Sequence, residues 1–217
     1  MTADLRPPAY RDRRHAGRVL TAHVRAAVDP AQTIVLALPR GGVPVAYELA
    51  VALGTPLDVL VVRKLGVPGF DELAFGAIAG GEQILNHKTI AMLGLPPEAI
   101  AATIARERAE LERRERAYRP GLPPPAVAGK TAVLVDDGLA TGATMQVAIA
   151  AVRSAGAARI VVAVPVGPRD TVTRLAALAD EVICTLVPRE LDGVGTWYDD
   201  FQQIGDAELR RLLAGEA

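Results

Sequence analysis

The chain has 217 residues, of which 50% are hydrophobic and 23% are charged, so its composition supports a folded core and excludes wholesale disorder. Its 24 basic and 25 acidic residues leave a formal net charge of −1, which argues against a general nucleic-acid-binding protein. A single cysteine, Cys184, excludes an internal disulfide and a multi-cysteine metal site. No apolar run approaches the ~18 residues of a membrane span, and the N-terminus carries no apolar signal core, so we expect a soluble, cytoplasmic protein without a membrane partner.

Helices and short apolar segments alternate in the N-terminal half of the chain. A helix is expected within residues 10–28, and another at 43–53 that ends where Gly54 supplies a helix stop. The predicted strands are runs rich in β-branched and apolar residues, at 33–39, 57–62, 75–79 and 83–85. Residues 65–71, LGVPGFD, contain several turn-forming residues, and we predict that they form a mobile loop that closes over a ligand.

The same alternation continues in the C-terminal half. Residues 96–118 predict the longest helix, whose narrow apolar seam indicates either a largely solvated helix or a packing or dimer helix. The remaining predicted elements are strands at 132–135, 160–164 and 181–186 and helices at 144–155 and 170–178. Strands that alternate with helices indicate βαβ units, so we predict a single α/β domain over residues 1–217, with a mostly parallel central sheet flanked by helices.

The strongest functional signal is the segment VLVDDGLATGAT, residues 133–144. Its apolar residues predict a strand, and Asp136 and Asp137 follow at the carboxyl end, where open parallel sheets bind ligands. The rest of the segment consists mostly of small residues that lead into a helix and include Ala140, Thr141, Gly142, Ala143 and Thr144. The free N–H groups of a helix start favour an anion, while carboxylates accept hydrogen bonds from hydroxyl groups or from a metal's water shell. The combination predicts a site for a sugar phosphate.

This segment resembles the motif with which type I phosphoribosyltransferases bind phosphoribosyl pyrophosphate (PRPP). The family motif likewise has an apolar strand, two acidic residues and a small-residue loop that contains threonine and glycine. One departure is Gly138, where many members carry an aliphatic residue or serine. The resemblance covers roughly residues 33 to 187.

Two further segments resemble the family in the expected order along the chain. LPRGG is similar to the pyrophosphate loop: Arg40 would supply charge, and Gly41 and Gly42 permit close approach of the backbone to a ligand. VRKL resembles the Arg-Lys pair of several members, and neither Arg63 nor Lys64 has an acidic residue nearby in the sequence that would neutralise it. Because adjacent residues of a strand point to opposite faces, we expect only one of this pair to reach the ligand directly.

The resemblance implies transfer of ribose 5-phosphate from PRPP to a nitrogenous base, with release of pyrophosphate. It implies that Asp136 and Asp137 engage the ribose hydroxyls, that the small-residue loop holds the 5′-phosphate, and that the catalytic residues are Arg63, Lys64 and Asp137. It also implies Mg²⁺ as a cofactor, coordinated largely by the ligand and by water, so that no direct protein ligand is assigned. The implied partners are PRPP and a nucleobase-like acceptor, and the chain is a candidate homodimer.

The acceptor site is predicted from aromatic residues near the C-terminus. Residues 187–217 form a candidate "hood", the small subdomain that covers the base in this family, together with a C-terminal segment. Trp197 and Tyr198 could stack on a planar base there, or they could instead pack into the core.

Three other functions stay open at this point. One is a non-catalytic regulator of the same fold that senses PRPP or a nucleotide, and another is a hydrolase or phosphorylase that acts on a phosphoribosyl compound. A response-regulator receiver also has paired acids after a strand, but places them after its first strand, whereas Asp136 follows much later in this chain.

Overall fold

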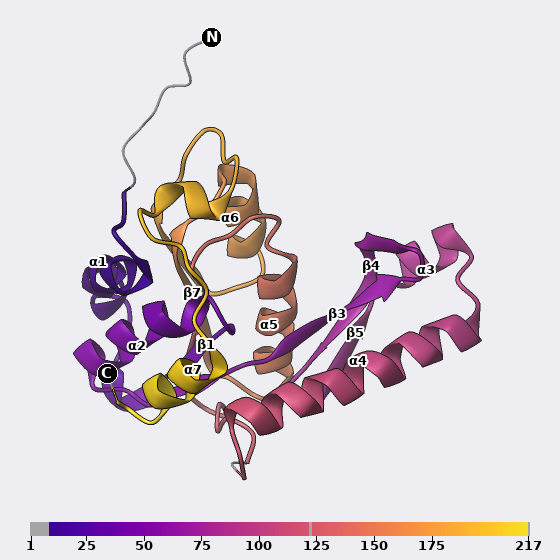
Figure 1. Cartoon of the computed structure of the whole chain (residues 1–217), viewed down its shortest axis with the longest axis horizontal. Coiled ribbons are helices and arrows are strands. Elements are labelled where there is room, and N and C mark those ends of the chain that lie inside the picture. The colour runs from indigo at the N-terminus through magenta and orange to yellow at the C-terminus, as the bar shows by residue number, and fades with distance from the viewer. Residues whose placement is uncertain (1–8, 122, 217) are drawn as a thin grey trace.

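The computed structural model describes residues 9–121 and 123–216. The chain forms a body around a five-stranded parallel sheet and an arm that extends to one side of it (Figure 1). The strands of the body run in the order β2-β1-β6-β7-β8. Their bounds are β1 (Thr33–Ala37), β2 (Leu57–Val59), β6 (Thr131–Val135), β7 (Arg159–Val166) and β8 (Glu181–Leu186).

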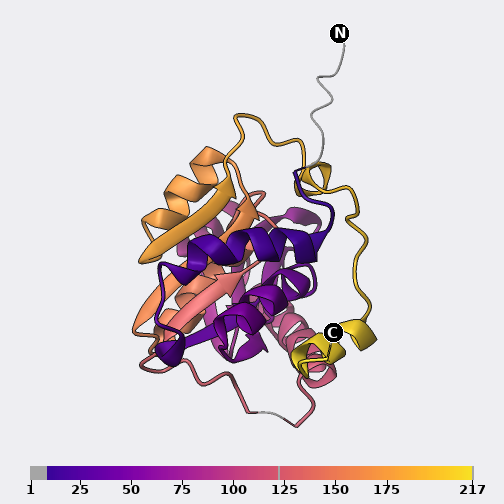
Figure 2. The same cartoon turned by 90° about the vertical axis from the view of Figure 1, so that its left-hand side faces the viewer.

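Helices cover both faces of this sheet. The helices of the body are α1 (Arg13–Arg25), α2 (Gly42–Leu53), α5 (Ala143–Ser154), α6 (Arg169–Ala176) and α7 (Asp206–Leu213). Figure 2 shows α1 and α2 in front of the sheet, on the face opposite α5 and α6. Alternate residues of β6 follow this division, because Val133 packs with α1 and α2 whereas Leu134 packs with α5. Burial on both faces explains why the strands read as continuous apolar runs, and the predicted α/β fold is confirmed.

The arm is a three-stranded antiparallel sheet packed against two helices. Its elements are β3 (Val62–Val67), β4 (Phe70–Ala79), β5 (Glu82–Leu85), α3 (His87–Leu93) and α4 (Pro97–Tyr118). The hairpin predicted around Gly80-Gly81 is confirmed, as is the long helix. That helix packs within its own chain, because Leu111 and Tyr118 are buried in the core that also contains Phe75 of β4.

Two sequence predictions about the arm are wrong. The strand predicted at 57–62 is divided between two sheets: β2 ends at Val59, and β3 begins at Val62 by pairing with Ala79. The segment predicted as a loop without strands at 65–71 is a β-hairpin, in which residues 65–67 belong to β3 and Phe70 begins β4, and its closure over a ligand stays a prediction. Only Pro68 and Gly69 form the turn, so the flanking residues remain available for pairing.

Among the described residues, two α-helices were not predicted from the sequence. The short α3 begins after Asn86, whose side-chain oxygen accepts a hydrogen bond from the Thr89 N–H at 3.0 Å. The second, α7, lies within the predicted hood and C-terminal segment, but it buries Leu209 and Leu212 in the core beside α2, so this part of the segment belongs to the body. Within residues 9–121 and 123–216, no helix combines the length and the hydropathy that a membrane span requires.

Candidate functional site

The two acidic residues of the motif lie at the carboxyl edge of the central sheet. Asp136 and Asp137 follow β6 directly, and the backbone N–H of Leu38, just beyond β1, donates to the Val135 carbonyl. The loop of residues 39–42 packs directly on them: a Cβ built on Gly41 would lie only 2.1 Å from the Asp137 Oδ2. The structure therefore brings the LPRGG loop and the acid pair together, and glycine is required at this point by the close approach.

The small-residue loop forms a cradle at the start of α5. Gly142 is the N-cap of this helix and adopts a left-handed conformation, with φ of +73°. Within the part of the chain that the structure describes, the backbone N–H groups of Thr144 and Met145 have no hydrogen-bond acceptor. These donors lie at the positive end of the helix dipole, which suits them to an anion.

Helix α6 supports this cradle from behind. The Thr171 hydroxyl donates to the Ala140 carbonyl at 3.0 Å, and Arg174 donates to the Thr141 carbonyl at 3.1 Å. These two loop carbonyls are thereby directed toward α6 and away from the start of α5, whose N–H groups stay available to donate hydrogen bonds. Thr141 is itself exposed, and the one contact that its hydroxyl oxygen accepts from the described residues is a long one, of 3.4 Å, from the Ala143 N–H.

The acid pair is electrostatically unusual. Burial raises the pKa of Asp136 well above its ordinary value, and the neighbouring Asp137 carboxylate raises it further. Burial also raises the pKa of Asp137, although an adjacent arginine offsets part of that rise. The two residues are linked by a hydrogen bond of 2.9 Å from the Asp137 N–H to the Asp136 Oδ1. A ligand that donates hydrogen bonds here would relieve this excess of negative charge.

The arginine beside the acid pair is Arg13, the first residue of α1, which the sequence analysis missed. Its Nε donates to the Asp137 Oδ2 at 2.7 Å, and its Nη1 donates to the Gln202 carbonyl at 2.8 Å. Its guanidinium carbon lies 3.8 Å from the centroid of the Phe201 ring. This ion pair joins positions 124 residues apart in sequence, and no local motif marks either the helix start or its partner.

The predicted base-stacking aromatics have other contacts. The Tyr198 ring is buried among Tyr10 and Phe201, and its hydroxyl donates to the Asp137 main-chain carbonyl at 2.5 Å. Neither face of this ring is available for a base, so the alternative in which the aromatic residue packs into the core describes Tyr198. Trp197 is half-buried against the same cluster.

Arg40 follows the first strand as predicted and remains partly accessible. Its side chain is 42% exposed, and its only ion pair among the described residues is a long one of 3.6 Å to Asp206 at the start of α7. An exposed pair of this length contributes little to stability, so Arg40 can exchange it for an anionic ligand.

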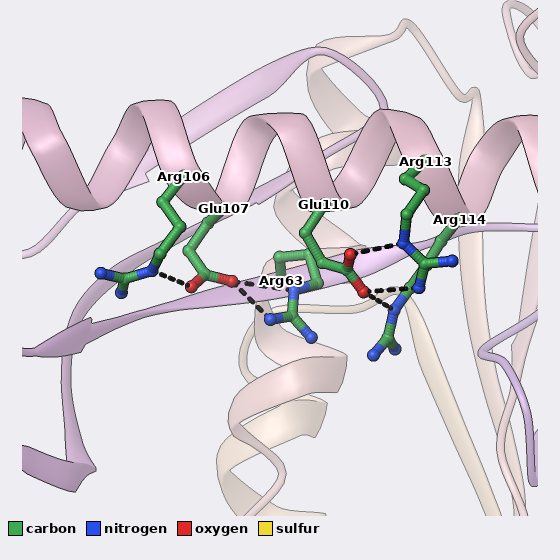
Figure 3. Close-up of polar contacts among 6 residues, drawn as sticks. All are labelled: Arg63, Arg106, Glu107, Glu110, Arg113 and Arg114. Carbon is green, nitrogen blue, oxygen red and sulfur yellow. Dashed lines mark hydrogen bonds and ion pairs between the residues drawn. The ribbon is translucent and has the colours of Figure 1, made fainter.

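Arg63 and Lys64 point in different directions, as expected from strand geometry (Figure 3 shows Arg63). Arg63 donates from Nε and Nη2 to the Glu107 Oε2 of α4, at 2.9 and 2.5 Å. No acid lies near Arg63 in the sequence, but the inference that its charge is therefore free to meet an anion is wrong, because its partner comes from a helix 44 residues away. Lys64 is exposed, and no ion pair is found for it among the residues that the structure describes.

Another hollow lies away from the motif. A cavity of about 880 Å³ is bounded by the C-terminal half of α4, the β4–β5 turn and residues 123–125. None of the predicted site residues lines it, so the cavity is distinct from the acid pair and its loops.

Comparison with known proteins agrees with this geometry. A family model described as "Phosphoribosyl transferase domain" matches residues 14–196. Two curated relatives from Mycobacterium tuberculosis, from strains H37Rv and CDC 1551 / Oshkosh, carry the name "Putative phosphoribosyl transferase" and are 46% identical over 205 residues. The alignment covers 94% of this chain but 46% of each relative, so the chain spans about half the length of the curated relatives it matches.

The fold is also similar to solved structures. TT1426 from Thermus thermophilus is 42% identical, with a TM-score of 0.82 and coverage of 94% of this chain and 97% of that one. AQ2163 from Aquifex aeolicus has a TM-score of 0.51 at 12% identity, over 94% of this chain and 85% of that one, which is a likeness of fold alone. Since the family model matches well over half of the chain, this protein belongs to the phosphoribosyl transferase domain family.

Proposed function

We propose that this protein is a PRPP-dependent phosphoribosyltransferase that moves ribose 5-phosphate to a nitrogenous base and releases pyrophosphate. The observation that carries the proposal is the placement of Asp136 and Asp137 beside the start of α5, where N–H groups lack acceptors among the described residues. Acceptors for sugar hydroxyls and donors for a phosphate thus lie a few residues apart, at the sheet edge where ligands bind in open α/β folds.

The reaction needs little covalent chemistry from the protein. The bond from the ribose carbon to pyrophosphate breaks as a base nitrogen forms its own bond to that carbon. The electron pair leaves with pyrophosphate, and the proton of the base N–H, where that nitrogen carries one, passes to solvent or to the released pyrophosphate. Positive charge develops on the ribose ring, which the carboxylates Asp136 and Asp137 stabilise, and negative charge grows on the leaving group. The N–H groups at the start of α5 hold the 5′-phosphate, and the loop of Arg40, Gly41 and Gly42 receives the pyrophosphate.

The donor set fits Mg²⁺ as a companion of the substrate. Among the described residues no group of three His, Cys, Asp or Glu could enclose a metal ion. Mg²⁺ prefers phosphate oxygens and water, and the acid pair would accept hydrogen bonds from its water shell. When bound, the ion would neutralise charge on the departing pyrophosphate.

The test is pyrophosphate release from Mg–PRPP in the presence of a panel of purines, pyrimidines and orotate. We expect release with at least one base, together with a matching nucleoside monophosphate product. Binding of PRPP measured by calorimetry, with no release for any base, would contradict the transferase and favour a sensor of PRPP. Absence of PRPP binding would overturn both functions.

A sensor remains the second candidate because of one observation. Arg63, expected as a cation for the leaving group, is engaged by Glu107, which leaves Arg40 and Lys64 as the predicted cations without a close acidic partner among the described residues. The same calorimetry and product assay separate the two functions.

Unequal effects are expected when Arg63 and Lys64 are replaced. Lys64→Ala should leave the unfolding midpoint unchanged but slow turnover about ten- to hundredfold, the loss of one charge-assisted contact worth roughly 1.5–3 kcal/mol. Arg63→Ala should lower stability, because it leaves Glu107, which is 11% exposed, without its partner at β3. The measurements are steady-state kinetics and thermal unfolding. Full activity of Lys64→Ala would remove this residue from the mechanism.

A further inference from the structure

Arg13 connects the acid pair to two segments that are distant in sequence. Its side chain is only 6% exposed, and its partner Asp137 is 14% exposed, so the ion pair is largely shielded from water. Three groups fix the guanidinium: the Asp137 carboxylate, the Gln202 carbonyl and the Phe201 ring. Hydrogen bonds along the edge of the guanidinium and an aromatic ring against its face together restrict the Arg13 side chain to a single orientation.

Two of these three groups belong to residues 194–202, which we call the C-terminal strap. Main-chain hydrogen bonds join the strap to Tyr10, just before α1. The Tyr10 N–H donates to the Trp197 carbonyl at 3.0 Å, and the Asp199 N–H donates to the Tyr10 carbonyl at 2.9 Å. The strap also covers the loop of the motif, because a Cβ built on Gly138 would lie 2.5 Å from the Val194 side chain. The strap therefore seals Arg13 and touches the proposed ligand loop at the same time.

The position of the Asp137 carboxylate follows from these contacts. Oδ2 is held by Arg13 and lies against Gly41 of the neighbouring loop. Among the described residues, no N–H or hydroxyl group of another residue donates to Oδ1, and the side chain that shares a hydrogen bond with this carboxyl group is that of Asp136. Arg13 thus holds one oxygen of the carboxylate, and the other, beside the Asp136 carboxyl group, is the one that we assign to a ligand hydroxyl.

We propose that Arg13 is a positioning residue of the phosphoribosyl site, which fixes the Asp137 carboxylate so that Oδ1 meets the ligand, and that the C-terminal strap holds Arg13 in this place. The inference rests on the proposed function for the identity of the ligand. It assigns Arg13 no contact with PRPP itself, and it explains why the strap crosses the motif at Gly138 although its buried aromatic Tyr198 offers no free face for a base.

The charged and titratable groups around Asp137 allow this to be tested without a ligand. Asp136 faces it from the adjacent position, Arg13 from α1, and Tyr198 from the strap, with Tyr10 behind Tyr198. Burial raises the pKa of Asp137 and the Arg13 charge lowers it. Removing that charge should therefore raise the apparent pKa of the acid pair further, since the two tyrosines remain neutral over the accessible pH range: burial raises the pKa of both hydroxyls.

The experiment is a carbon-13 NMR titration of aspartate carboxyl groups in the full ligand-free chain, with Asp136→Asn and Asp137→Asn spectra for assignment. Arg13→Gln should raise the apparent pKa of the pair by about one unit or more, and Arg13→Lys should restore much of the original titration. The matched control is Arg14→Gln, because Arg14 also begins α1 and donates to a carboxylate, Glu48 Oε1, at 2.6 Å, but lies outside the site. The control should leave the titration unchanged.

Calorimetry with Mg–PRPP supplies the second readout. Arg13→Gln should weaken binding about ten- to hundredfold near pH 7 and recover part of that loss as the pH rises and the acid pair ionises. Phe201→Leu keeps the ion pair but removes the stacked ring, so a smaller change in the same direction is expected even if Arg13→Gln folds poorly. A loss of thermal stability in both variants with an unchanged acid titration would overturn the proposal, because Arg13 would then be merely structural.

These readouts separate the two proposals. If the native chain does not bind PRPP, the proposed function is contradicted, and PRPP is no longer the ligand of this site. The NMR titration then still decides whether Arg13 and the strap control the Asp137 carboxylate.

Discussion

Asp136→Asn is expected to stabilise the ligand-free protein while it abolishes PRPP binding. The buried carboxylate of Asp136 lies beside a second carboxylate, and asparagine retains the Oδ1 that accepts from the Asp137 N–H. Removing one of two like charges should raise the free energy of unfolding at pH 7 by about 1–2 kcal/mol. The same change removes a charged acceptor from the proposed ribose site, and we expect binding to fall below detection in calorimetry.

The stabilisation by Asp136→Asn should depend on pH, in a direction set by the raised pKa of Asp136. The pKa of Asp136 is raised in the folded state above its ordinary value of 3.8, so the folded state holds its proton to higher pH than the unfolded chain does. Native stability therefore falls as pH rises from about 4 through the raised pKa, and this loss is absent in Asp136→Asn. Denaturant unfolding should show similar stability for the two proteins near pH ~4 and a growing advantage of the variant toward pH ~8.

The neighbouring substitution is the matched control and should act in the opposite direction. Asp137→Asn leaves Arg13 buried without its carboxylate, which costs about 3 kcal/mol and lowers the melting temperature by about 6–12 °C. Both variants should lose PRPP binding. Equal stability changes in Asp136→Asn and Asp137→Asn would contradict this electrostatic description of the site.

Gly142→Ala is expected to weaken PRPP binding at least tenfold. Gly142 has φ of +73°, and an added Cβ would lie 2.6 Å from the Thr171 Cγ2, so α6 or the loop must move. Thr171 holds the Ala140 carbonyl, and its displacement would misalign the N–H groups proposed to bind the 5′-phosphate. We expect a stability loss of roughly 2–3 kcal/mol from the left-handed backbone and the steric clash together.

Two further variants separate strain from the site. Gly54→Ala has a similar φ of +70° with no atom within 4 Å of the added Cβ, so it should cost about 1 kcal/mol and leave PRPP affinity unchanged. Adding Thr171→Ser to Gly142→Ala removes the clashing methyl group but keeps the hydroxyl, and should restore most of the affinity. Unchanged affinity of Gly142→Ala itself, measured by calorimetry, would show that this loop does not hold the ligand.

What could be predicted from the sequence was local in the chain. The βαβ alternation follows from apolar periodicity within each segment, and the parallel sheet of the body confirms it. The motif around Asp136 could be recognised in the sequence because its strand, acidic residues, loop and helix start lie within a dozen residues. The LPRGG loop could be recognised for the same reason. The meeting of these two segments followed from a general rule, that parallel strands place their carboxyl ends at one edge.

Only the tertiary structure decided which distant groups meet. The apolar run at 57–62 can pair in either sheet, and its division between β2 and β3 depends on β1 and β4. The partners of Asp137 and Arg63 lie 124 and 44 residues away, and Tyr198 is packed rather than free because Tyr10 lies against it. Periodicity reports which face of an element is apolar, but the identity of a charge's partner depends on how whole elements pack, and no local pattern encodes that.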